Sequence, residues 1–182
     1  MRFTQIIRRR YAIRFAFLIL AVAALFGVTI APAGAQTAVP ASVAAPRLAG
    51  TGICYNAYVG GIGWMGWACD GTVAGTTGRS LSIQAIKIVT TGLNGICARA
   101  HKLRFAGWME QVCAPDDVEL MLGSTGRSSP LSALMFDTGS GTLCAQVHMG
   151  FIGWMDQVCD RATITVGTPD RALDIQAIWL AV

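Results

Sequence analysis

The chain has 182 residues, enough for one ordinary domain with flanking segments but too few for two large domains. Hydrophobic residues make up 53% and charged residues 13%, which excludes a disordered polyelectrolyte. Five of the 14 basic residues and none of the ten acidic ones lie in residues 1–35, so the rest of the chain is near neutral, at −1, and we expect no binding to nucleic acid.

Residues 1–35 have the pattern of a signal peptide. Arginines at 8–10 and at 14 precede an apolar run, and residues 33–35, Ala-Gly-Ala, are small enough for a signal peptidase. We therefore expect cleavage after Ala35 and a secreted or periplasmic mature protein without membrane association. The alternative is an uncleaved membrane anchor, because the run approaches the length of a span. The segment 36–50, rich in Ala and Pro, is expected to be a flexible linker.

Residues 51–182 contain one pattern three times. Each copy has a cysteine, then Gly-Trp-Met, then a second cysteine five residues after the tryptophan. The tryptophans, Trp64, Trp108 and Trp154, are 44 and 46 residues apart. A period this regular indicates three copies of one supersecondary unit, over about 51–92, 93–140 and 141–182.

All six cysteines lie inside the repeats, and each repeat can close its own disulfide. The predicted pairs are Cys54 with Cys69, Cys97 with Cys113, and Cys144 with Cys159. The midpoint of each pair is at or beside glycine, so a hairpin turning there places the two cysteines opposite each other. Export to an oxidising compartment favours disulfides. The alternative is a zinc site, but no close cysteine pair or Cys/His cluster is present.

Side chains of such hairpins alternate between two faces. The face that carries Trp64, Trp108 and Trp154 is mostly apolar, so we expect these three residues in the structural core, with sugar stacking as the alternative. The opposite face carries the cysteines together with polar and aromatic side chains. These are the candidate ligand-binding residues: Asn56, Tyr58, Trp67, Arg99, His101, Gln111, Gln146, His148 and Gln157.

The last strand of each repeat is expected over 81–89, 131–136 and 173–182. These segments are apolar on both faces, which is typical of central strands. The sequence therefore predicts an all-β fold of three pseudo-symmetric repeats in a β-prism-like arrangement. The alternative is a β-trefoil, which needs six strands in a barrel and six in a cap.

The first repeat resembles the clostridial hydrophobic repeat with a conserved Trp, the ChW repeat. The resemblance is carried by Gly63-Trp64, Trp67, Asp70-Gly71 and the segments 74–78 and 81–88. In the other two repeats Gln111 and Gln157 replace the second tryptophan. The resemblance extends over about 53–182. It implies a secreted or surface-attached protein with roles in adhesion, surface assembly or polysaccharide interaction, and no established catalytic residues.

The residues themselves favour binding over catalysis. His101 and His148 occupy equivalent places in two repeats, where the first repeat has Tyr58, so they do not form a convergent set. The acidic segment with Asp116, Asp117 and Glu119 is typical of a solvated surface. We therefore expect no catalytic residue, no metal and no cofactor. The predicted function is lectin-like recognition of cell-surface or cell-wall glycan by a secreted module; the alternative is a protein–protein adhesion or surface-assembly domain without sugar binding.

Overall fold

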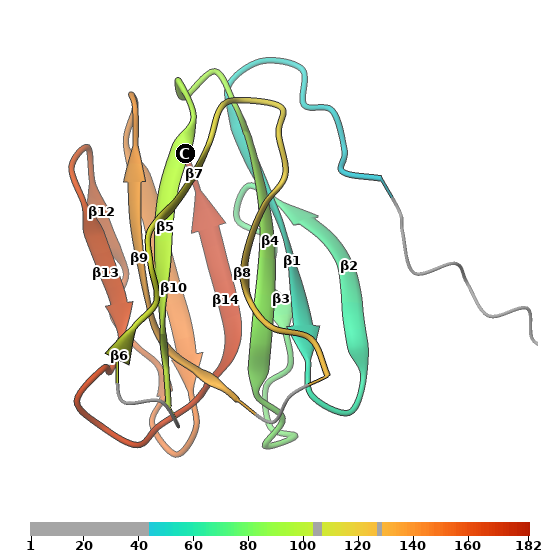
Figure 1. Cartoon of the computed structure of the whole chain (residues 1–182), viewed down its shortest axis with the longest axis vertical. Coiled ribbons are helices and arrows are strands. Elements are labelled where there is room, and N and C mark those ends of the chain that lie inside the picture. Colours follow the sequence, from blue (N-terminus) through green and yellow to red (C-terminus); the bar gives the residue numbers. More distant parts are fainter. Residues whose placement is uncertain (1–43, 104–106, 127–128) are drawn as a thin grey trace, which may run out of the picture. The chain divides into compact units, whose positions relative to one another are not determined.

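The computed structural model describes residues 44–103, 107–126 and 129–182, and every regular element in this part of the chain is a β-strand (Figure 1). The predicted signal peptide and most of the predicted linker lie outside the described residues. The first repeat forms β1 (Gly52–Val59), β2 (Gly63–Cys69), β3 (Ala74–Gly75) and β4 (Ile83–Thr91). The second forms β5 (Ile96–Lys102), β6 (Gly107–Trp108), β7 (Val112–Ala114), β8 (Leu120–Gly123) and β9 (Leu131–Thr138). The third forms β10 (Leu143–Met149), β11 (Gly153–Trp154), β12 (Val158–Asp160), β13 (Ile164–Gly167) and β14 (Ile175–Ala181).

These strands form three antiparallel sheets. The first sheet has the order β2-β1-β4-β8. The second has the order β13-β9-β5, with β6 and β7 both paired to the far edge of β5, and the third has the order β3-β14-β10, with β11 and β12 paired to β10. Three separate sheets confirm the β-prism-like prediction and exclude the barrel that a trefoil requires. The last strands β4, β9 and β14 are central, as their apolar pattern predicted.

Each repeat opens with a disulfide-closed hairpin, as predicted. Cys54 lies directly opposite Cys69 in the pairing of β1 with β2, and the other two pairs have the same register. The disulfides join Cys54 to Cys69, Cys97 to Cys113, and Cys144 to Cys159. All six thiols are used in this way, so the cysteines are not zinc ligands.

The short strand that precedes the last strand of each repeat connects the repeats to one another. We call β3, β8 and β13 the exchange strands, because each pairs with the last strand of a different repeat. The strand β8 pairs with β4, β13 pairs with β9, and β3 pairs with β14. Each repeat thus completes the sheet of its neighbour, and the β3–β14 pairing closes the ring between the first and last repeats. No repeat has a complete sheet of its own, so the three depend on one another for stability.

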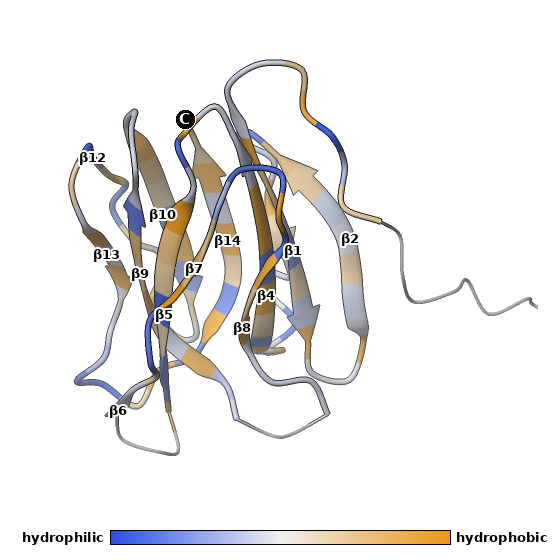
Figure 2. Ribbon diagram, turned by 45° about the horizontal axis from the view of Figure 1, so that its top comes forward, coloured by the Kyte–Doolittle hydropathy of each residue, from blue (hydrophilic) through white to orange (hydrophobic). Residues whose placement is uncertain are grey.

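One apolar core receives side chains from all three sheets. Its largest fully buried members include Ile53 and Tyr55 in β1, Leu134 and Phe136 in β9, and Leu143 in β10. Figure 2 shows the corresponding hydrophobic colour along the central strands, for example on β4, β10 and β14. Burial of this shared cluster is the main favourable contribution to folding.

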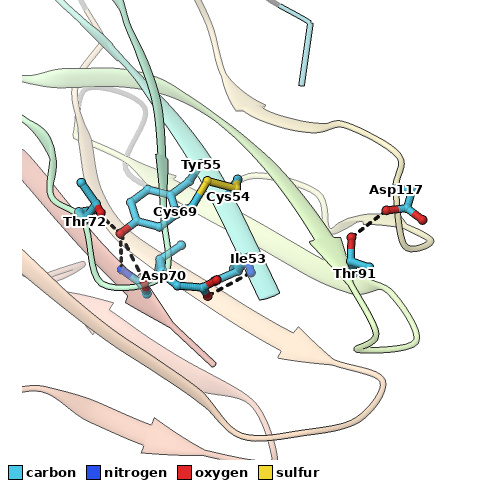
Figure 3. The surroundings of a disulfide bond; sticks show 9 residues. Ile53, Cys54, Tyr55, Cys69, Asp70, Thr72, Thr91 and Asp117 are labelled. Atoms are coloured by element: carbon cyan, nitrogen blue, oxygen red, sulfur yellow. Dashed lines mark hydrogen bonds between the residues drawn. A yellow bond between two sulfur atoms is a disulfide. The ribbon is translucent and has the colours of Figure 1, made fainter. Parts of the chain in front are cut away.

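Tyr55 joins the first hairpin to the last strand. Its hydroxyl donates to the carbonyl oxygen of Thr72 and accepts the backbone N–H of Leu180 at 2.9 Å. Figure 3 shows this hydroxyl at the end of the ring away from the Cys54–Cys69 disulfide, pointing at Thr72. The N–H of Gly71 in the same turn donates to the carbonyl oxygen of Leu180 at 2.7 Å. Like the β3–β14 pairing, these hydrogen bonds join the first repeat to the last strand of the third repeat.

Candidate functional site

Each sheet has an inner face that contacts the core and an outer face that points away from it. In β1 the side chains of Ile53, Tyr55 and Ala57 belong to the core, so Cys54 and Asn56 lie on the outer face. The same alternation holds in β5 and β10, where alanines at 98 and 145 are in the core beside the outward cysteines. The predicted cysteine-bearing face is therefore the outer face of each sheet.

A β-bulge in the first hairpin changes the direction of its tryptophan. Tyr58 lies opposite Trp64 and Asn56 lies opposite Trp67, so three steps along β2 match two steps along β1. The extra residue reverses the alternation between the bulge and the turn. Gly66 lies in this bulge with a φ of 102°, a conformation that favours glycine. Trp64 consequently lies on the outer face, on the same side as Cys54.

The other two hairpins have the same extra residue. Trp108 and Val112 are four positions apart, whereas their partners His101 and Ala98 are three positions apart. The third hairpin repeats this spacing. The prediction that Trp64, Trp108 and Trp154 are core residues is therefore wrong: Trp154 is 39% exposed, the other two are half-buried, and the methionines that follow at 109 and 155 pack against the core instead.

The three tryptophans form the same aromatic pair in each repeat. Tyr58 contacts Trp64 edge to face, with ring centroids 5.4 Å apart. His101 with Trp108 and His148 with Trp154 adopt the same arrangement at 5.5 Å. On its other side, each of Tyr58, His101 and His148 lies opposite an alanine of the last strand, at positions 85, 133 and 177. The threefold equivalence of Tyr58, His101 and His148 is thus confirmed, and edge-to-face geometry stabilises each pair.

The charged neighbours of these pairs differ between repeats. Lys87 in β4 places its Nζ 5.0 Å from the Trp64 ring centroid and 2.8 Å from a carboxylate oxygen of Glu119. In the second repeat the guanidinium of Arg99 lies 4.9 Å from the Trp108 ring centroid. In the third repeat Gln146 lies at the position equivalent to Arg99, and Trp179 lies at the position equivalent to Lys87. A cation therefore stacks on the indole in two repeats and is replaced by neutral side chains in the third.

Two of the candidate ligand-binding residues are structural. Asn56 is only 6% exposed, and its Oδ1 accepts the N–H of Gly66 at the bulge. His101 is 8% exposed, and its Nδ1 lies 2.7 Å from the hydroxyl of Ser132. The prediction that these two side chains are available to a ligand is wrong, because both are buried and Oδ1 of Asn56 and Nδ1 of His101 bond within the domain.

The remaining candidates lie on the outer faces as predicted. Tyr58, Trp67, Arg99, Gln146 and His148 are half-buried, whereas Gln111 and Gln157 are exposed. Gln146 donates to the carbonyl oxygen of Met155 at 2.8 Å, at the bulge of the third hairpin. Lys87 and Trp179 were not among the predicted candidates; they extend the outer faces from strands that were predicted to be apolar on both faces. A lysine and a tryptophan within such apolar strands were the available signal.

The acidic segment of the second repeat anchors a turn. The carboxylate of Asp116 accepts N–H groups of residues 93–95 and the hydroxyl of Thr90. Burial raises the pKa of Asp116, but these hydrogen bonds outweigh it and hold the pKa below its ordinary value. Asp117 accepts the hydroxyl of Thr91 at 2.6 Å, also visible in Figure 3. Among the described residues, no group of three or more His, Cys, Asp or Glu side chains is placed to hold a metal ion.

A shallow pocket of about 380 Å³ lies beside the Cys97–Cys113 disulfide, away from the aromatic pairs. It is lined by the β4–β5 turn, by Pro115 and by the end of β9 with Asp137. Asp137 is the one titratable side chain among its lining residues, because both cysteines are in the disulfide. The pocket therefore offers no pair of groups for acid–base chemistry.

A family model matches part of the first repeat. The family described as Clostridial hydrophobic W matches residues 58–92, which include Trp64, its partner Tyr58 and the exchange strand β3. No curated protein and no solved structure matches the chain. Within the part of the chain that the structure describes, no helix is long and apolar enough to span a membrane.

Proposed function

We propose that the protein is an exported, non-catalytic binding module that recognises glycan through the outer faces of its three repeats. The observation that carries this proposal is the position of the three tryptophans. The same bulge turns each of them out of the core, although burial of an indole would stabilise the fold by several kcal/mol, roughly 2–3 or more. An aromatic surface beside polar groups fits the apolar face and hydroxyl rim of a pyranose ring.

Two further observations support the class of the module. Three disulfides are typical of proteins that fold in an oxidising compartment, outside the cytoplasm. Oδ1 of Asn56, Nδ1 of His101 and the carboxylate of Asp116 form structural hydrogen bonds, which supports a binding function over catalysis. Three similar faces on one domain also favour multivalent binding, in which weak single contacts add up on clustered ligands.

Replacement of Trp154 by alanine tests the proposal most directly. We expect Trp154→Ala to weaken binding to an immobilised glycan at least tenfold, which corresponds to about 1.4 kcal/mol, while the domain still unfolds cooperatively, with a melting temperature lowered only by loss of the partly exposed ring and its pair with His148. Glycan-array binding followed by calorimetry measures the first effect and thermal unfolding the second.

Val118→Ala is the matched control, because Val118 is an exposed apolar residue outside the aromatic pairs. A wild-type protein that binds no glycan on an array that includes cell-wall fragments would contradict the proposal.

A second candidate function, protein–protein adhesion, is favoured by the tip of the third hairpin. Phe151 is fully exposed there with a φ of 67°, next to exposed Ile152. The first hairpin has glycine at the same place, Gly61, with a φ of 81°. A bulky residue in this conformation costs about 1–2 kcal/mol, and its exposure adds nothing to the core. Contact with another protein would explain its presence.

Phe151→Gly is expected to stabilise the domain by about 1 kcal/mol, because glycine adopts this conformation without strain. Urea unfolding measures the effect. If the tip mediates adhesion, the same variant loses self-association in analytical ultracentrifugation while it keeps glycan binding. A variant that loses stability would show that Phe151 packs against the domain.

A further inference from the structure

We infer that the outer face of the second repeat binds the acidic group of a glycan through the guanidinium of Arg99. This inference rests on the proposed function and assigns one of the three faces a different ligand chemistry from the other two. Arg99 lies at the position that Asn56 and Gln146 hold in the other two repeats.

The three outer faces differ in their free charge. In the first repeat the ammonium of Lys87 is neutralised by Glu119 at 2.8 Å. In the third repeat Gln146 lies at the position of Arg99, and its amide donates to a backbone carbonyl. In the second repeat Arg99 has no ion pair within the described residues, and the exposed Glu110 of the same hairpin lies beyond ion-pair distance. On the second face the guanidinium of Arg99 therefore has no carboxylate within ion-pair distance among the described residues, although Asp137 lies on the same face, opposite Cys97.

The guanidinium of Arg99 is held in place by two neighbours. Its Cζ lies 4.9 Å from the Trp108 ring centroid, and its Nε–H donates to the sulfur of Met135 at 3.2 Å. Neither contact uses the two terminal nitrogens, which have no acceptor among the described residues. A guanidinium fixed in this way keeps its planar fork available for a carboxylate or phosphate, and little side-chain freedom is lost on binding.

The surroundings of this group fit an acidic sugar. Gln111 is exposed on the same face and carries an amide that can donate to and accept from hydroxyl groups. The indole of Trp108 and the ring of His101 supply the aromatic pair found in the other repeats. A uronic acid or a phosphorylated sugar would place its charge on Arg99 and its ring beside Trp108 and Gln111.

The test compares ligands that differ only in charge. Wild-type protein is titrated with an oligogalacturonate and its neutral methyl ester, and with an oligomannose with and without a phosphate. We expect binding to at least one acidic ligand to be tenfold or more tighter than to its neutral counterpart, and this preference to weaken as salt is raised. The carboxylate and phosphate ligands distinguish the two sources of charge.

Arg99→Gln is expected to remove the preference while thermal unfolding stays cooperative, and Arg99→Lys to restore part of it. Lys87→Gln is the matched control, because Lys87 stacks on the equivalent tryptophan but is already ion-paired. We expect this control to keep the preference.

Two results would overturn the inference alone: equal binding of acidic and neutral glycans, or an Arg99→Gln variant that keeps the preference. Glycan binding would remain in both, so the proposed function would stand. Absence of binding to every glycan, or binding of a poly-glutamate peptide in its place, would overturn the inference together with the proposed function.

Discussion

Gly123→Ala is expected to lower the free energy of unfolding by about 3 kcal/mol or more. Gly123 ends the exchange strand β8 with a φ of 86°, and a Cβ at this position would lie 2.2 Å from the carbonyl oxygen of Gln84. The Cβ is bonded directly to the backbone of β8 and the carbonyl belongs to the backbone of β4, so the clash can be relieved only by separating β8 from β4. Urea unfolding followed by fluorescence measures the loss.

Gly126→Ala separates the clash from the backbone strain. Gly126 also has a positive φ, 71°, but a Cβ there would meet no atom within 4 Å. We expect this variant to lose only about 1 kcal/mol, the cost of the left-handed conformation. Equal losses in the two variants would show that close approach of the exchange strand does not determine the stability.

The equivalent glycines explain why the repeats could be counted from sequence but their connections could not. Gly75 and Gly167 also have positive φ and approach the carbonyl oxygens of Gln176 and Ser132, the counterparts of Gln84. The repeat aligns these three glycines at the start of a loop. The strand that each one approaches belongs to another repeat, and local sequence carries no information on that long-range pairing.

The hairpins were predicted more completely at one end than at the other. The cysteines fixed the register at the open end, where Cys54 lies opposite Cys69. Nearer the turn, the prediction extended strict alternation over five residues to Trp64, and a single extra residue reversed the result. Gly66 was the local signal for a bulge in the first repeat. The third repeat has Asp156 in its bulge, where no residue with a positive φ marks it.

The outer face was predicted in part for a similar reason. Tyr58 and His148 follow from the alternation of the first strands, which is regular as far as these residues. The charge of the face depends on pairs that form across strands, such as Arg99 opposite Met135 and Asn56 opposite Lys87. Register between distant strands decides those pairs, so sequence alone did not identify them.

Tyr55→Phe is the second change with a large expected effect. Removal of the hydroxyl leaves the buried N–H of Leu180 and the carbonyl of Thr72 without a partner, where the first repeat meets the last strand. An unsatisfied buried group costs about 1–3 kcal/mol, so we expect a loss of about 2–3 kcal/mol at neutral pH. The aromatic ring and its packing remain, so the variant still folds.

The same hydroxyl makes stability depend on alkaline pH. Burial raises the pKa of Tyr55 to about 12, against 10.0 for the free side chain; the charge of Asp70 adds to this rise, and the hydrogen bond with Leu180 opposes it. Because the ionised form is favoured in the unfolded chain, the stabilisation is complete below pH 10 and is lost as the pH rises to about 12. The stabilisation lost over this pH interval is roughly 3 kcal/mol.

Phenylalanine cannot ionise, so the difference in unfolding free energy between wild type and Tyr55→Phe must shrink over this interval. Urea unfolding of both proteins at several pH values from 8 to 12 measures it, and a constant difference would show that the Tyr55 hydroxyl is not buried in the closure of the ring.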